Sequence, residues 1–205
     1  MKLKVSNGNT KVGKDTFIMN ITSATDCPTK KLGLCKIVKV CYALQPELRW
    51  CNKIKNILRY RRQQTKMFDT FHAKKLAELL IEKARSKRKT EIKYLRVSET
   101  GDFRSQADVK KISTIADILK EEEIKVYGYT ARSDLNFENL SDNLVMNGSG
   151  FMLDNNFVAV KEYSGNAAKC KQNCRICNLC KQKNGLTIEV PFHGVAFNYL
   201  KRRKR

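Results

Sequence analysis

The chain has 205 residues, of which 41% are hydrophobic, enough for one globular domain with its own core. It has no apolar run of about 18 residues and no apolar segment near its start, which excludes a membrane-spanning protein and predicts residence in the cytoplasm. Its net charge of +21 indicates a polyanionic partner, of which nucleic acid is the commonest. The alternative is that an AT-rich genome has inflated the lysine content.

The first half of the chain predicts a strand, a long helix and a second strand. Residues 16–21 alternate apolar and polar side chains, as a short strand does. From about Asn56 to Arg85, apolar residues recur at three- and four-residue spacing, which predicts one long helix that contains His72. Residues 92–98 then read as a strand.

The second half continues the alternation of helices and strands. Ser105, with Asp108 three residues later, resembles the capping box that begins a helix, and this helix should end near Glu122. Residues 164–185 are polar and predict irregular structure. Further strands are predicted at 124–130 and 187–190, with short apolar runs between them at 144–146 and 157–160.

Alternating strands and helices at this spacing predict an α/β fold with a mainly parallel sheet. We expect residues 1–200 to form a single domain shaped as an incomplete (β/α) barrel, followed by a basic tail at 201–205. The cysteine-rich segments 27–51 and 170–180 should meet at one side of this domain and bind metal. The sequence carries no signal for oligomeric state.

The second cysteine segment is the strongest chemical motif in the chain. It places four thiols within eleven residues, at Cys170, Cys174, Cys177 and Cys180. Thiolates suit both Zn²⁺ and iron–sulfur clusters. Two-residue gaps repeated in series are typical of ferredoxin-like cluster sites, whereas zinc knuckles are usually separated by a longer loop. The spacing therefore favours an iron–sulfur cluster, with zinc as the alternative.

The first cysteine segment has looser spacing. Seven residues separate Cys27 from Cys35, and five separate Cys35 from Cys41. Three thiols with one coordination position left open would describe a reactive metal centre. Cys51 is either a fourth ligand or a buried free cysteine beside Trp50. A single site that draws ligands from both segments is a further alternative.

Polar residues follow the predicted strands, at the end of a parallel sheet where active sites usually lie. Glu99 and Asp102 are candidate acid–base or ligand-binding carboxylates. Arg132 is a candidate clamp for a carboxylate or phosphate. The competing structural roles are a turn cap for Asp102 and an ion pair for Arg132. Residues 147–150 are interpreted as an ordinary tight turn, because no complete phosphate-binding pattern is present.

Several motifs occur together over about residues 16–195, and in combination they resemble the phage gene-product-88 family of bacteriophage and mobile-element genomes. The resemblance implies a phage origin, and hence the cytoplasm of a host cell. The motifs, in order, are Cys27-Pro28, Gly33-x-Cys35, Cys41-Tyr42-Ala43, Gly101-Asp102-Phe103, Tyr129-Thr130-Ala131-Arg132, Asn147-Gly148-Ser149-Gly150 and the four-cysteine run.

The chain is also distantly similar to radical S-adenosylmethionine enzymes. Those enzymes place a three-cysteine loop after the first strand of a partial (β/α) barrel, and later cysteines often bind an auxiliary cluster. The tripeptide Cys41-Tyr42-Ala43 resembles theirs, whereas the spacing of Cys27, Cys35 and Cys41 is wider. The similarity implies that these three cysteines ligate a cluster and makes S-adenosylmethionine a candidate cofactor. It does not carry over the reaction.

We therefore expect a phage iron–sulfur protein, with 4Fe-4S as the cluster type, that acts on or beside nucleic acid. One alternative is an enzyme similar to the radical S-adenosylmethionine class. The other is a zinc-stabilised protein that binds nucleic acid or a host protein without catalysis. The number of thiolates on each metal separates these classes, since three leave a position open for chemistry and four favour a structural role.

Overall fold

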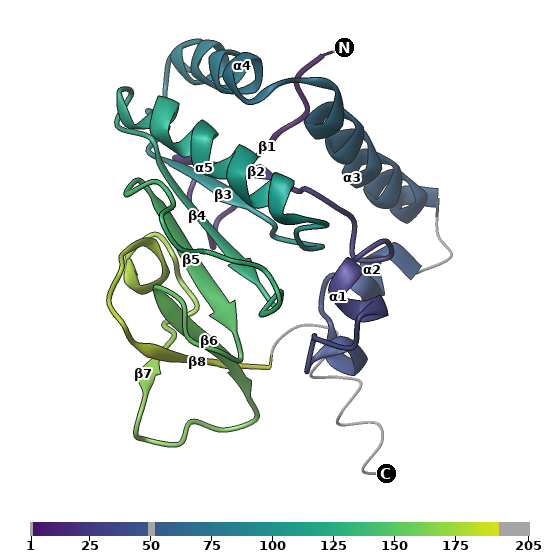
Figure 1. Ribbon diagram of the computed structural model, residues 1–205, viewed down its shortest axis with the longest axis vertical. Helices are drawn as coiled ribbons and strands as arrows, with labels where there is room; N and C mark the ends of the chain where they lie inside the picture. The colour runs from purple at the N-terminus through teal and green to yellow at the C-terminus, as the bar shows by residue number, and fades with distance from the viewer. Residues whose placement is uncertain (1, 49–51, 193–205) are drawn as a thin grey trace.

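The computed structural model describes residues 2–48 and 52–192, which form an eight-stranded sheet with helices packed on it (Figure 1). The strand order is β1-β2-β3-β4-β5-β6-β8-β7, and every neighbouring pair is parallel except β1 and β2. The sheet is open. The predicted α/β fold with a mainly parallel sheet is confirmed. The strands are β1 (Ser6–Asn7), β2 (Thr16–Met19), β3 (Tyr94–Val97), β4 (Lys125–Thr130), β5 (Leu144–Ser149), β6 (Asn155–Val160), β7 (Ala168–Lys169) and β8 (Thr187–Pro191).

The three longest helices, α3, α4 and α5, lie together on one side of the sheet, and the short α1 and α2 lie beside its lower end in Figure 1. In the described part of the chain, no helix combines the length and apolarity needed to cross a bilayer. The helices are α1 (Pro28–Lys31), α2 (Leu44–Leu48), α3 (Asn52–Thr70), α4 (Ala73–Arg85) and α5 (Gln106–Lys120), with 3-10 turns η1 (Val38–Val40) and η2 (Leu179–Lys181).

The prediction of a single long helix over Asn56–Arg85 is wrong, because two helices, α3 and α4, occupy this segment. The Phe71 N–H still bonds to the Met67 carbonyl at 3.1 Å, but His72 is extended, with φ −65° and ψ 159°. His72 is therefore the N-terminal flanking residue of α4 and not part of a helix. The apolar spacing continues through the break because both helices pack into the same core, to which Phe68 and Leu76 belong.

The other predicted elements are found close to their expected positions. The helix after Ser105 is α5, but the Ser105 side chain makes no cap hydrogen bond, and Asp108 instead accepts from the Arg104 N–H at 2.9 Å. The segment 164–185 is mostly irregular, as predicted, and contains only β7 and η2 as short regular elements among the described residues. Cys51 and the basic tail lie outside the described residues.

The two faces of the sheet have different roles because side chains alternate along each strand. One face carries an aligned row of apolar residues that packs in the core with the long helices, namely Phe17, Leu95, Val126 and Leu144. The next row points to the opposite face, and it consists of Ile18, Arg96, Tyr127 and Val145. This second face, which contains an arginine and a tyrosine, lines the cavity described below.

Candidate metal centre in a cysteine-lined cavity

A cavity of about 390 Å³ lies at the carboxyl ends of the parallel strands, and cysteines from both ends of the sequence line it. Its walls include the ends of β3, β4 and β5 together with both cysteine segments. The sequence predicted that the two segments would meet at one side of the domain, and the structure brings them to this cavity. The cysteines are Cys27, Cys35, Cys41, Cys170, Cys174, Cys177 and Cys180.

A buried carboxylate anchors the first cysteine segment. Glu47, on α2, has a fully buried side chain that forms an ion pair of 2.5 Å with Arg61 of α3. Its carboxylate also accepts hydrogen bonds from the backbone N–H groups of Ala24 and Thr25, at 3.0 and 2.7 Å, and from the Thr25 hydroxyl at 2.7 Å. Ala24 and Thr25 lie three and two residues before Cys27, so Glu47 fixes the start of the cysteine loop against α3.

A second buried network joins the strand ends next to this segment. Asp102 accepts hydrogen bonds from the N–H groups of Phe103 and Ala131, at 2.8 and 2.7 Å, and from the Thr130 hydroxyl at 2.6 Å. The Thr22 hydroxyl bonds to both the backbone N–H and the carbonyl of Asp102. Gly101 has φ +70°, and a Cβ there would lie 2.2 Å from the Thr22 hydroxyl, so this approach requires glycine.

Two buried asparagines anchor the second cysteine segment to the sheet. The Asn147 amide on β5 donates to the Gly128 carbonyl at 2.9 Å and to the Cys180 carbonyl at 3.0 Å. Asn155 on β6 donates to the Asn147 side-chain oxygen at 3.0 Å and to the Gln182 carbonyl at 2.8 Å. Hydrogen bonds from two fully buried side chains therefore hold the irregular cysteine loop against the sheet.

A buried lysine lies within the second cysteine segment. Lys181 is 4% exposed, its ammonium lies 3.8 Å from the centre of the Tyr94 ring, and it donates to the Cys174 carbonyl at 3.0 Å. Burial lowers its pKa, while Asp15 and the thiols of Cys174, Cys177 and Cys180 oppose that change. A cation in this position is well placed to offset negative charge on these thiols.

Burial favours the neutral form of four of the thiols. Burial raises the pKa of Cys27, Cys35 and Cys170, and it raises that of Cys180 to about 11. Hydrogen bonds act in the opposite direction. The Gln172 N–H donates to the Cys170 sulfur at 3.4 Å, and the Ile37 N–H does the same for Cys35. A bound metal would deprotonate these thiols and turn such N–H groups into partners of thiolates.

The thiols form two groups that face the same cavity. The interactions that shift their pKa values connect Cys35 with Cys27 and Cys41, and connect Cys180 with Cys170, Cys174 and Cys177. Over residues 2–48 and 52–192, no three or more His, Cys, Asp or Glu side chains are arranged to hold a metal ion. A cluster differs from a single ion because each thiolate bonds to its own iron atom, so the ligand sulfurs stand farther apart. Metal ligation by the cysteines therefore stays a prediction.

Of the three polar residues that the sequence suggested as site residues, two line the cavity and one does not. Glu99 and Asp102 line the cavity, and the Glu99 carbonyl accepts from the Tyr42 hydroxyl at 2.6 Å. Burial raises the pKa of Asp102 to about 6, against the hydrogen bonds that favour its carboxylate. Arg132 is not among the residues that line the cavity. Its guanidinium is occupied by Asp134, at 2.7 and 2.8 Å, and by the Phe103 carbonyl at 2.6 Å.

The sequence reasoning missed residues that lie within strands. Residues 147–150 do not form the expected tight turn, since residues 147–149 belong to β5 and Asn147 holds the second cysteine loop. Arg96 and Tyr127 line the cavity from β3 and β4. The alternation in Tyr94–Val97 was the available signal, because it separates Arg96 from the apolar Leu95 and Val97.

Fold and site together define an open-sheet α/β protein with a thiol-lined cavity at the carboxyl ends of its strands. The sequence model of one family, described as Gene product 88, matches residues 1–185. The chain therefore belongs to the Gene product 88 family, as the order of its motifs predicted. No curated protein and no solved structure matches the chain.

Proposed function

We propose that this protein is an iron–sulfur protein that carries a four-iron cluster on each of its two cysteine groups and acts on or beside nucleic acid. The observation that carries the proposal is the meeting of seven thiols, from two distant parts of the sequence, in one cavity at the carboxyl ends of the strands. Four thiols in one group would ligate a cluster fully. Three in the other group would leave one iron open, unless Cys51 completes it.

The surroundings of the thiols support a thiophilic centre. Both groups consist of sulfur ligands without a histidine among them, and soft thiolates favour iron–sulfur clusters or zinc over hard cations. Backbone N–H groups reach the sulfurs of Cys35 and Cys170, and Lys181 adds a buried positive charge beside the second group. Such hydrogen bonds and charges stabilise the negative charge of a thiolate-bound cluster.

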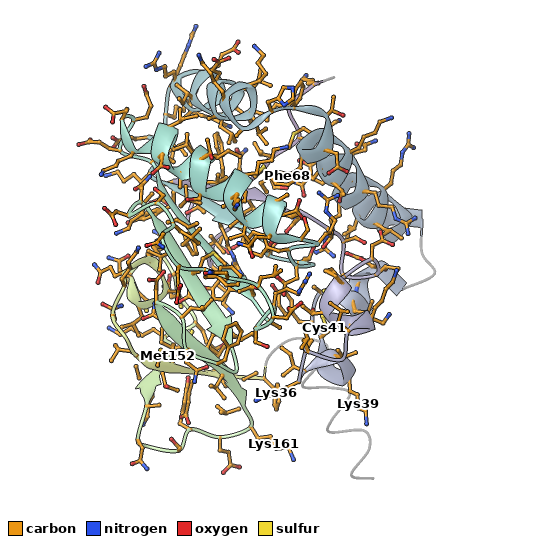
Figure 2. The ribbon with its side chains drawn as sticks, viewed as in Figure 1. Lys36, Lys39, Cys41, Phe68, Met152 and Lys161 are labelled. Atoms are coloured by element: carbon orange, nitrogen blue, oxygen red, sulfur yellow. The ribbon has the colours of Figure 1, made fainter. Side chains whose placement is uncertain are left out.

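Basic side chains near the cavity support the nucleic-acid part of the proposal. Figure 2 shows Lys36, Lys39 and Lys161 at the same end of the molecule as Cys41. All three lysines are exposed, as is Arg175 of the second cysteine segment. Together with the net charge of +21, these residues would attract a phosphate backbone to the end of the molecule where the thiols lie.

Oxygen-free purification followed by iron, sulfide and zinc analysis tests the metal assignment. We expect a brown protein with acid-labile sulfide and iron in similar amounts. A colourless protein with stoichiometric zinc and no iron would reject the clusters and leave the zinc alternative.

Binding to single- and double-stranded DNA and to RNA, measured over a series of salt concentrations, tests the nucleic-acid assignment. Affinity should fall steeply as salt rises, because binding releases condensed counterions. Replacing Lys36 and Lys39 by glutamine should reduce the slope of log affinity against log salt, whereas replacing Lys75, which lies on α4, should leave it unchanged. Affinity that does not respond to salt would contradict a phosphate-binding surface.

A radical S-adenosylmethionine-type enzyme is the second candidate function. The observation that favours it is the three-thiol group in the loop that follows β2, the first of the parallel strands. Spectral change of the reduced protein on addition of S-adenosylmethionine, followed by detection of 5′-deoxyadenosine, tests this candidate. Unchanged cluster spectra would reject it and leave the binding protein.

A further inference from the structure

Three polar side chains of the cavity wall, two on β3 and β4 and one directly after β3, have atoms without hydrogen-bond partners. Among the described residues, the Arg96 Nε, the Ser98 hydroxyl and the Tyr127 hydroxyl are buried and unpaired. Tyr127 is 1% exposed and Ser98 4% exposed, and all three residues line the cavity. Buried polar atoms are nearly always hydrogen-bonded, so three unpaired ones on the same wall need an explanation.

The Arg96 guanidinium is held in place but its donors are little used. It lies over the Tyr129 ring, with the Cζ atom 5.2 Å from the ring centre. Its ion pair with Glu99 is long, at 4.0 Å, although the Arg96 side chain is only 15% exposed. A buried cation normally has a close, hydrogen-bonded counter-ion. The contact with Tyr129 holds the guanidinium against the cavity wall, and its unpaired Nε is available to donate to a planar anion.

The backbone conformation of Ser98 is a second, independent indication that this wall binds a ligand. Its φ of 54° lies in the left-handed region, which costs a residue with a side chain more than it costs glycine. A serine here has a strained backbone and a hydroxyl that is unpaired within the described residues. Glycine would relieve the strain at no loss of hydrogen bonding inside the protein, which indicates that the hydroxyl serves something outside it.

From this wall we infer a binding site for the carboxylate group of a small ligand, with Arg96 as the anchor and the Ser98 and Tyr127 hydroxyls as flanking donors. The guanidinium edge matches a carboxylate through two parallel hydrogen bonds. The aromatic rings of Tyr127, Tyr129 and Phe157 line the same cavity and suit an apolar or aromatic body attached to that group. None of its three polar residues is a cysteine, but the site shares its cavity with the thiols of the proposed clusters.

The charge balance favours a carboxylate over a phosphate. Glu99 already places a negative charge 4.0 Å from the guanidinium, so the pair as a whole is neutral. A singly charged carboxylate adds one negative charge beside Arg96, whereas a phosphate monoester would add nearly two next to Glu99. Like charges at this distance in a poorly solvated cavity repel strongly. A ligand with a carboxylate therefore fits the wall better.

Ligand-observed NMR titrations of the full-length protein with benzoate test the inference directly. Benzamide has the same shape without the charge, and phenyl phosphate has the same ring with a larger charge. We expect benzoate to bind at least about tenfold more tightly than either, since a charge-assisted pair contributes more than about 1.4 kcal/mol. Equal binding of benzamide, or tighter binding of phenyl phosphate, would overturn the carboxylate assignment.

Variants separate this site from a purely structural role of Arg96. In Arg96→Gln, benzoate binding should fall at least about tenfold, whereas the control Arg62→Gln, which removes an exposed arginine paired with Asp26, should leave it unchanged. Tyr127→Phe and Ser98→Gly should each weaken benzoate several-fold, and Ser98→Gly should raise the urea midpoint. Unchanged benzoate affinity in folded Arg96→Gln, or in both hydroxyl variants, would overturn the inference.

Discussion

Glu47→Gln is the change that best tests how the first cysteine segment is held in place. Glutamine keeps the length and shape of the side chain but replaces one carboxylate oxygen by an NH₂ group. The Glu47 carboxylate is surrounded only by donors, namely Arg61, the Ala24 N–H and the N–H and hydroxyl of Thr25. The new NH₂ group must therefore face another donor, and Arg61 loses its counter-ion.

The expected loss of stability follows from the burial of this pair. The side chains of Arg61 and Glu47 are 12% and 0% exposed, so water cannot replace the lost interactions. Removing one partner of a buried, hydrogen-bonded ion pair usually costs about 3–5 kcal/mol. The control is Asp26→Asn, because Asp26 pairs with Arg62 while the two side chains are 43% and 55% exposed. An exposed pair contributes roughly 0–1 kcal/mol.

Urea denaturation followed by circular dichroism measures both free energies of unfolding under the same conditions. We expect a clear fall in the midpoint for Glu47→Gln, a small change for Asp26→Asn and the same slope with urea in both. The iron content of Glu47→Gln should also fall, since Cys27 follows the anchored residues. If the two variants lose the same stability, or if Glu47→Gln loses less than about 1 kcal/mol, the reasoning is refuted.

Three further predictions concern other buried groups of the site. Asn147→Leu should lower the free energy of unfolding by about 2–3 kcal/mol, because it removes the amide hydrogen bonds to the Gly128 and Cys180 carbonyls and the acceptor of the Asn155 amide. An unchanged midpoint of thermal unfolding would contradict this prediction. Asp102 has its pKa raised from 3.8 to about 6, so its contribution to stability is complete below pH 3.8 and is lost as the pH rises through about 6. At about 1.4 kcal/mol for each pKa unit, the free energy of unfolding should fall by about 3 kcal/mol over this range. Asp102→Asn should not show this fall, and parallel stability–pH profiles of the variant and the wild type would refute the prediction. Lys181→Met removes a buried positive charge beside the second cysteine group and should therefore lower the reduction potential of the proposed cluster. An unchanged potential in a redox titration would contradict this prediction.

Local patterns predicted the fold class well because they report directly on secondary structure. The strands β2, β3, β4 and β8 and the helix α5 could be located from apolar periodicity, and the alternation of strands and helices implied a parallel sheet. The break between α3 and α4 had no such signal, because neither Phe71 nor His72 is a glycine or proline and the apolar spacing continues across it. The insertion of β8 between β6 and β7 was also hidden, since β7 has only two residues.

The candidate site was predictable in its cysteines and much less so in its other residues. Thiol spacing marks both cysteine segments locally, and the structure brings them to one cavity. Polar residues after strands were the natural candidates, yet Arg132 is occupied by Asp134 and Asp102 is saturated with hydrogen bonds. Arg96 lies inside a strand, and its role depends on which face of the sheet the helices cover, a property of the tertiary packing.

The iron content of three proteins prepared without oxygen is the most direct test of the central claim. Two four-iron clusters predict about eight iron atoms for each wild-type chain, and about four each for Cys35→Ser and Cys177→Ser, because each variant removes a ligand of a different cluster. Loss of all iron in either variant would instead indicate one shared site. Zinc without iron in the wild-type protein, or thiols that bind no metal, would contradict the account.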